Sequence, residues 1–277
     1  MVAGRERRGG VRRPSRGRRA VLPAPILVTV PNPRSPQTGQ PTPWNRPISE
    51  TPDAGSDLST GATLLRCEAV LFDCDGVLVD SAAIVLDSWT RWALRLGVDP
   101  AILLPTVQGR RSQDTVAQFI EPSRRESAVE LIDAIELEDA ATTPPIPGAG
   151  DLLASIPDRN RAIFTSGSQA LARTRLAAAG IPIPRVLVAG EDVTHGKPHP
   201  EGYRAAAAGL GVDPRNCVVV EDAAPGIRAA RAAGVRHVLG VGDLDVGEDR
   251  PDLTVPDLRD VRWTGAGLEV LLAAPRS

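Results

Sequence analysis

Residues 67–81 read CEAVLFDCDGVLVDS, and this stretch decides how the rest of the chain is interpreted. Its first half, residues 67–73, holds an unbroken apolar run, which is typical of a strand buried on both faces of a sheet. Two aspartates, Asp73 and Asp75, follow with a glycine after them, which indicates that the strand ends in a loop. Positions two apart in an extended segment face the same way, so both carboxylates can approach one substrate centre if a cation offsets their repulsion. A solvated Asp-Gly turn is the alternative.

After this strand we expect a helical segment, followed by a segment in which strands and helices alternate. Apolar residues at helical spacing recur in 82–97, 100–107, 112–120 and 123–138. Strands are then predicted at 161–167, 185–190, 216–222 and 236–242, and helices at 168–179, 200–209 and 225–233. This pattern predicts an α/β fold: a Rossmann-like parallel sheet with helices on both faces. A helical cap inserted after the first strand would cover the carboxyl edge of the sheet, where ligands bind.

We therefore expect three parts: a disordered Arg/Pro-rich N-terminal extension at 1–66, an α/β core at 67–81 and 145–273, and a helical cap at 82–144. The extension holds eleven arginines and four acidic residues, with prolines throughout. Three interpretations of this extension stay open: a signal or transit peptide, a basic solvated arm, or sequence upstream of a true start near Leu64.

Charge and cysteine content restrict the partners. The net charge of -2 divides into +7 over residues 1–66 and -9 over the remainder, so the core is not expected to bind nucleic acid. The sequence contains no uninterrupted apolar stretch of about 18 residues, so no membrane span is expected. Three scattered cysteines without a CxxC motif fit a reducing compartment and argue against a disulfide framework and a zinc site. We expect a cytoplasmic monomer.

Three further motifs follow predicted strands. TSGS (165–168) offers a hydroxyl and helix-start amides that favour phosphate, although it could be an ordinary helix cap. HGKPHP (195–200) contains Lys197, the single lysine among 32 basic residues, which is a candidate for a position that requires an ammonium group. VVVEDAAPGI (218–227) places two acids after an apolar strand, as in sites where one or two carboxylates hold Mg²⁺. A solvated lysine and a helix N-cap are the alternatives for these last two.

His195 and His199 are four residues apart, a spacing that brings two metal ligands together on a helix. Gly196 and Pro198 between them make a helix improbable, so we interpret both as loop histidines.

The order of the four motifs, D-x-D-G-V-L-V-D-S, h-T-S-G-S, G-K-P-x-P-E-G-Y and h-h-h-E-D-x-x-x-G-I, resembles the haloacid dehalogenase superfamily over residues 67 to about 245. The resemblance is to its sugar-phosphatase and beta-phosphoglucomutase-like branch, which has a helical cap after the first strand. It implies a phosphoric monoester hydrolase that forms an aspartyl-phosphate intermediate on a small-molecule phosphorylated substrate.

The resemblance also implies roles for individual residues. Asp73 matches the nucleophile and Asp75 the general acid/base. Ser166, the amide of Gly167 and Lys197 match the groups that hold the transferring phosphoryl. A carboxylate approaches a dianionic phosphate only when its charge is neutralised, which agrees with a lysine and a cation at this position.

The implied cofactor is Mg²⁺. Its ligands would be the Asp73 carboxylate, the Asp75 backbone carbonyl and Asp222, with Glu221 contributing directly or through water. The founding dehalogenases lack an acid at the position of Asp75 and need no metal, so this residue favours phosphate chemistry.

For the substrate, the cap loop GRRSQDT (109–115) resembles the loop that faces the active site in the sugar-phosphatase branch. Gly109, Arg110, Arg111 and Ser112 are therefore candidate substrate-binding residues, with a solvated helix start as the alternative. Trp89 and Trp92, three apart on the first cap helix, are interpreted as cap core rather than as a sugar-stacking surface.

Two other functions stay open. A phosphomutase of the same fold is disfavoured because mutases carry a histidine where Val85 stands here. A non-catalytic binding protein recruited through its Arg-rich arm is disfavoured by the intact motifs.

Overall fold

The computed structural model describes residues 61–244 and 246–271, which belong to one compact unit. The larger of its two sheets has six parallel strands in the order β4-β3-β2-β5-β6-β7. Their bounds are β2 Ala69–Phe72, β3 Arg161–Phe164, β4 Leu187–Val188, β5 Cys217–Glu221, β6 His237–Val241 and β7 Leu253–Val255. The predicted α/β fold is confirmed. The predicted strand at 185–190 is only two residues long.

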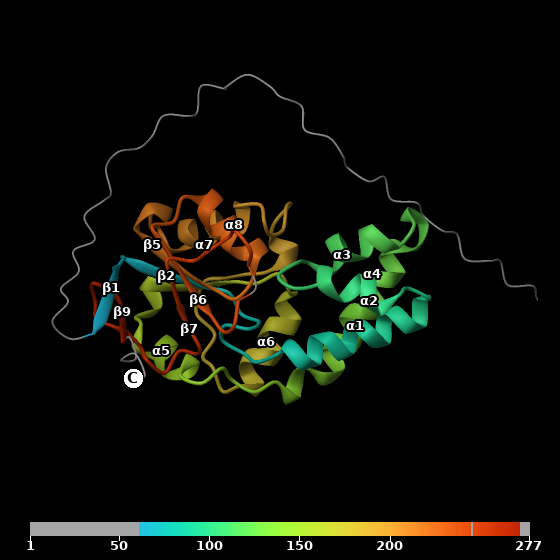
Figure 1. Ribbon diagram of the computed structural model, residues 1–277, viewed down its shortest axis with the longest axis horizontal. Helices are drawn as coiled ribbons and strands as arrows, with labels where there is room; N and C mark the ends of the chain where they lie inside the picture. Colours follow the sequence, from blue (N-terminus) through green and yellow to red (C-terminus); the bar gives the residue numbers. More distant parts are fainter. Residues whose placement is uncertain (1–60, 245, 272–277) are drawn as a thin grey trace, which may run out of the picture. The chain divides into compact units, whose positions relative to one another are not determined.

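Helices cover both faces of this sheet, as predicted. Figure 1 shows α7 and α8 on one side of the strands and α5 and α6 on the other. Their bounds are α5 Ala149–Ser155, α6 Gln169–Ala178, α7 Glu201–Leu210 and α8 Ala224–Ala233. Helix α5 has no counterpart among the helices expected from the sequence.

Alternate residues of each central strand feed two separate apolar layers. In β2, Val70 and Phe72 pack into the layer with α5 and α6, whereas Ala69 and Leu71 pack into the layer with α7 and α8. This follows from the two-residue period of a strand. Because both faces are covered, every residue of β2 is buried, which explains its continuous apolar run.

The helices between β2 and α5 have an apolar core of their own. Their bounds are α1 Ala82–Leu96, α2 Pro100–Leu103, η1 Leu104–Thr106, α3 Ser112–Phe119, η2 Pro122–Arg124, α4 Arg125–Asp139 and η3 Ala140–Thr142. Trp89 and Trp92 lie in this core, with ring centroids 5.3 Å apart, and the indole N–H of Trp92 donates to the carbonyl of Ala128. Tryptophan packing inside this helical segment agrees with the interpretation of these residues as cap core.

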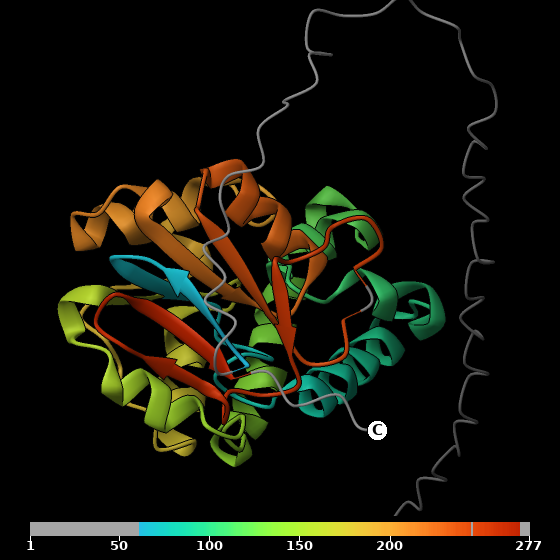
Figure 2. The ribbon, with the colours of Figure 1, turned by 60° about the vertical axis from the view of Figure 1, so that its left-hand side comes forward.

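The ordered part of the chain begins before Cys67, because a second, antiparallel sheet includes β1. This sheet has the strand order β1-β9-β8, with β1 Ala62–Arg66, β8 Val261–Trp263 and β9 Gly267–Leu271. Order was expected from Cys67, yet β1 pairs along its whole length with β9, and Figure 2 shows the blue β1 beside the red end of the chain. Leu65 packs with the α5 and α6 layer. Short strands of this kind carry no signal until the distant partner is known. The remaining extension, residues 1–60, lies outside the described residues.

The 3₁₀ turns η4 Asp158–Asn160, η5 Gly190–Asp192 and η6 Pro214–Asn216 connect the core elements. Within the part of the chain that the structure describes, no helix is long and apolar enough to cross a membrane.

Candidate active site

Asp73 follows strand β2 directly, and its carboxylate is buried against a lysine. The residue is 4% exposed, and its backbone N–H donates to the carbonyl of Val220 in the neighbouring strand β5. Its Oδ1 lies 2.6 Å from Nζ of Lys197. Burial raises the pKa of the Asp73 carboxyl well above its usual range, while the lysine acts in the opposite direction. The carboxylate form therefore depends on nearby positive charge.

Lys197 is surrounded by groups from three elements. Its Nζ donates to Oε1 of Glu221 at 2.5 Å, and the hydroxyl of Tyr203 donates to the same oxygen at 2.7 Å. The rings of Phe164 and Tyr203 lie 5.1 and 5.4 Å from Nζ. Burial by itself would lower the pKa of Lys197, but Asp73 and Glu221 outweigh burial and raise the pKa above its usual range. The side chain thus stays charged and points at Asp73.

Glu221 has both carboxylate oxygens engaged. Beside the two donors on Oε1, Oε2 accepts the backbone N–H groups of Asp222 and Ala223 at 2.9 and 3.1 Å. A Cβ on Gly226 would lie 1.6 Å from Oε1, so glycine is required for Glu221 to adopt this position. The geometry makes Glu221 the residue that positions Lys197, a role that the sequence did not indicate.

Asp75 is held by an arginine that the sequence analysis missed. Its Oδ1 accepts the hydroxyl of Ser81 at 2.7 Å and a guanidinium N–H of Arg175 at 2.8 Å. Arg175 also donates to Oε1 of Glu136, in helix α4, at 3.4 Å. The one feature of the sequence that could have indicated this role is the position of Arg175 beside Leu176, on the face of helix α6 that is buried. Among described residues Oδ2 of Asp75 accepts no hydrogen bond, so this oxygen is available to a ligand.

Glu136 reaches this site from the helical segment that follows β2, and its side chain is 7% exposed. Burial raises the pKa of its carboxyl to about 7, with Arg175 acting in the opposite direction.

A candidate cation site lies at the ends of β2 and β5. Asp73, Glu221 and Asp222 each place one carboxylate oxygen within 4.8 Å of the others. Burial and the Glu221 carboxylate raise the pKa of Asp222 to about 7, although a hydrogen bond from Gln108 at 3.1 Å lowers it. Gly76 has φ +80°, and a Cβ there would lie 2.1 Å from Oδ2 of Asp222. The donors are all oxygens and their carboxylates crowd one another, which fits a hard divalent cation.

Most of the predicted site residues surround one cavity of about 220 Å³. Those that line it are Asp73, Asp75, Gly109, Arg110, Ser112, Ser166, Gly167 and Asp222. Ser166 Oγ donates to the carbonyl of Gly109 at 3.0 Å, which joins the loop after β3 to the cap loop. Residues at the carboxyl ends of three parallel strands therefore meet at one place, as expected for such a sheet.

Arg111 corrects one expectation, because it does not line the cavity. Its guanidinium forms a bidentate pair with Asp114 and donates to the carbonyls of Gly190 and Val193. The side chain is 8% exposed. Arg111 therefore binds the cap loop to the η5 turn of the core. Adjacent arginines at a helix start point in different directions, and the sequence could not tell which of them lines the cavity.

The cap contributes an apolar wall to the cavity. Its members are Ala82, Val85, Leu86, Trp89, Leu104 and Val107. Trp89 is thus both part of the cap core and part of the cavity wall.

Comparisons with known proteins agree with this geometry. Residues 67–234, more than half of the chain, match the haloacid dehalogenase-like hydrolase family. The chain belongs to this hydrolase family.

Two relatives of the hydrolase are named as phosphatases. It is 38% identical over 176 residues to hexitol phosphatase A of Escherichia coli, an alignment that covers 62% of this chain and 80% of the relative. It is 33% identical over 191 residues to validoxylamine A 7'-phosphate phosphatase of Streptomyces hygroscopicus, with 65% and 89% covered. The structure of beta-phosphoglucomutase from Clostridium difficile superposes with a TM-score of 0.61 at 25% identity, over 69% of this chain and 92% of the other. The predicted superfamily and branch are confirmed.

Proposed function

We propose that this hydrolase is a Mg²⁺-dependent phosphatase of a small phosphorylated metabolite, a sugar or polyol phosphate, and that it acts through an aspartyl-phosphate on Asp73. The observation that carries the proposal is the Lys197–Asp73 pair beside a group of carboxylate oxygens that could hold a cation, with Asp73 and Asp222 lining the cavity. The names of the relatives support the substrate class, since they include a hexitol phosphatase and sugar-phosphate phosphatases.

The proposed chemistry has two steps on this chain's own residues. In the first, an Asp73 carboxylate oxygen bonds to phosphorus while the bond from phosphorus to the substrate oxygen breaks, and Asp75 protonates the leaving alkoxide through its free Oδ2. In the second, Asp75 takes a proton from water, whose oxygen attacks phosphorus and releases Asp73 and inorganic phosphate. Lys197, Ser166 and the amide of Gly167 would hold the phosphoryl oxygens.

Mg²⁺ would be held by Asp73, Asp222 and the backbone carbonyl of Asp75, and when bound it neutralises negative charge on the phosphoryl group. The four donors around Glu221 leave it better suited to position Lys197 than to bind the metal directly. The sequence left open whether Glu221 binds the metal directly or through water, and this proposal excludes direct binding.

Hydrolysis is favoured over a mutase reaction by Val85, which stands in the cavity wall where the mutases carry a histidine. An apolar side chain there cannot exchange a proton with a substrate hydroxyl.

The test is a phosphate-release screen of purified protein against a panel of sugar and polyol phosphates, with Mg²⁺ and with EDTA. We expect release from at least one member, and its loss in EDTA. Isomerised product without free phosphate would identify a mutase instead. Absence of turnover across the panel, in protein that is folded by circular dichroism, would contradict the proposal. A deletion used to test the extension should stop at residue 60, because Ala62 and Thr63 pair with β9.

A further inference from the structure

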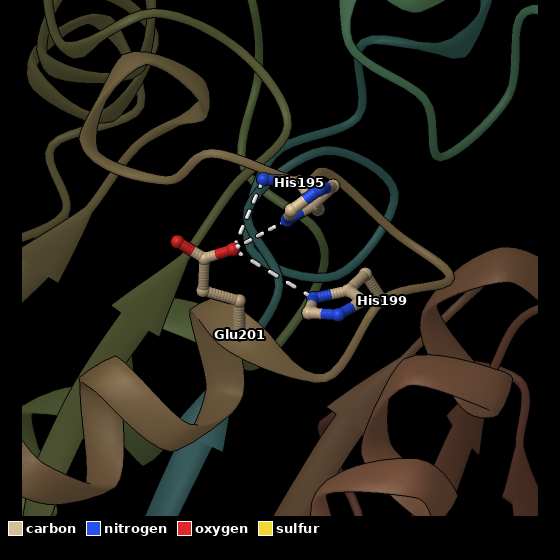
Figure 3. A group of neighbouring side chains, drawn as sticks. All are labelled: His195, His199 and Glu201. Carbon is tan, nitrogen blue, oxygen red and sulfur yellow. Dashed lines mark hydrogen bonds and ion pairs between the residues drawn. The ribbon is translucent and has the colours of Figure 1, made fainter.

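Two histidines and a glutamate come together on the surface where the Lys197 loop enters helix α7. Figure 3 shows His195 and His199 on this loop, with the carboxylate of Glu201, from the first turn of the helix, directed toward both rings. Their side chains are 63%, 49% and 31% exposed. None of the three lines the active-site cavity.

The distances within this group match those among ligands of one metal ion. Each residue offers one donor atom, and the three atoms lie within 4.8 Å of one another. Oε2 of Glu201 lies 3.1 Å from Nδ1 of His195 and 3.7 Å from Nδ1 of His199. Two ligands bound tetrahedrally to zinc at about 2.05 Å are separated by about 3.3 Å. The two observed distances lie on either side of that value.

The group is also held in place before any metal binds. The backbone N–H groups of Thr194 and His195 donate to the two oxygens of Glu201 at 2.8 and 3.0 Å. These hydrogen bonds, that of Thr194 foremost, lower the pKa of Glu201 to about 2, so the carboxylate is ionised at neutral pH. The N–H of His199 donates to the carbonyl of Gly196 and closes the turn, and Lys197 is anchored in the core beneath it.

We propose that His195, His199 and Glu201 form a site for a divalent transition metal such as Zn²⁺, separate from the Mg²⁺ site of the cavity. Two imidazoles and one carboxylate suit zinc, cobalt or nickel, whereas Mg²⁺ prefers oxygen donors. With three protein ligands the fourth position is left to water. Each imidazole would bind the metal as the neutral ring, through Nδ1 with its proton on Nε2.

Both histidines lie on a loop, as expected from Gly196 and Pro198, and the loop itself brings the imidazole rings to within 4.6 Å of each other. The scarcity of cysteines argued against zinc, yet it does not bear on a site built from imidazole and carboxylate. Because its two histidines flank Lys197, a bound metal would join both ends of the turn that carries the lysine. We therefore expect the metal to stabilise the folded protein.

The test uses the full chain without a purification tag, stripped with EDTA and then dialysed into saturating Mg²⁺ so that the cavity site is filled. Zn²⁺ is titrated in by calorimetry, and the melting temperature is measured with and without Zn²⁺. The variant is the double substitution His195→Ala with His199→Ala, and the control is His237→Ala, which removes the third histidine, located on β6.

We expect the wild type and His237→Ala to bind one more equivalent of Zn²⁺ than the double variant, and to show a rise in melting temperature that the double variant lacks. Equal stoichiometry and affinity in all three proteins would overturn the proposal. Should the double variant misfold by circular dichroism, wild-type protein loaded with Co²⁺ decides the question. A visible absorption band of tetrahedral cobalt supports the site, and its absence overturns it.

Discussion

Nζ of Lys197 lies 2.6 Å from Oδ1 of Asp73, although 124 positions separate the two residues in sequence. One follows the central strand of the sheet and the other lies on the loop before helix α7. Each side chain depends on the other: the lysine keeps its charge because carboxylates surround it, and the buried carboxylate is favoured by the ammonium. The proposed chemistry depends on this pair.

Replacement of Asp73 by Asn should abolish turnover, because the amide cannot act as the nucleophile while side-chain volume is preserved. We expect phosphate release to fall by roughly 1000-fold or more, with an unchanged circular dichroism spectrum. Asp87→Asn, on the exposed face of α1, is the control and should retain activity. Substantial hydrolysis in Asp73→Asn would remove this residue from the role of nucleophile.

Lys197→Arg should cost activity although the charge is kept. The side chain of Lys197 is fully buried between Asp73 and Glu221, and the broader planar guanidinium does not fit a space shaped for an ammonium group. We expect kcat/KM to fall by roughly 100-fold, as for loss of a preorganised charge-stabilising group. Initial rates on the best substrate of the screen measure it, and wild-type rates would mean that the lone lysine has no special part.

Gly76→Ala should weaken Mg²⁺ binding, because the added Cβ would collide with Oδ2 of Asp222. Gly97→Ala is a matched control: its φ of +73° is close to the +80° of Gly76, but nothing lies within 4 Å of its added Cβ. Both variants should lose about 1 kcal/mol of unfolding free energy from backbone strain. Only Gly76→Ala should need a higher Mg²⁺ concentration for half-maximal phosphate release. Equal Mg²⁺ dependence in the two variants would contradict the role of Asp222 as a metal ligand.

Arg110 and Arg111 are adjacent but should behave differently when each is replaced by alanine. Arg110 lines the cavity, so its loss should raise KM by about 10-fold, as expected when one charged hydrogen-bond partner of an anion is removed. Arg111 ties the cap loop to Asp114 and to the carbonyl of Gly190, so its loss should lower the unfolding free energy by about 2–4 kcal/mol. Steady-state kinetics and urea unfolding distinguish the two effects, and a reversal of the pattern would contradict the placement of these side chains.

Glu136→Gln should change how stability depends on pH. Burial raises the pKa of this acid from 4.5 to about 7, so the folded protein binds a proton that the unfolded chain has released over that interval. The stabilising contribution is present below pH 4.5 and is lost as the pH rises through 7. Between pH 5 and pH 8, urea unfolding should therefore show Glu136→Gln gaining stability relative to wild type, by up to about 3 kcal/mol. A relative loss at pH 8 would show that the pairing of the Glu136 carboxylate with Arg175 outweighs its burial.

The parallel sheet and the meeting of the motifs could be predicted because both follow from local pattern and elementary geometry. An apolar run that ends in polar residues marks a buried strand, and parallel strands bring their carboxyl ends to one edge. Asp73, Ser166 and Asp222 could therefore be placed together without coordinates, and Lys197 was singled out by its rarity in the composition.

Only the tertiary structure assigned Arg175 to Asp75, Glu221 to Lys197, and Arg111 to the η5 turn. It also paired β1 with β9 and brought His195 and His199 toward Glu201. These relationships join residues whose side chains could equally well have faced solvent. The direction of a long polar side chain, and the partner of a short edge strand, are set by which groups the folded chain leaves unpaired nearby, and no local pattern in the sequence records that.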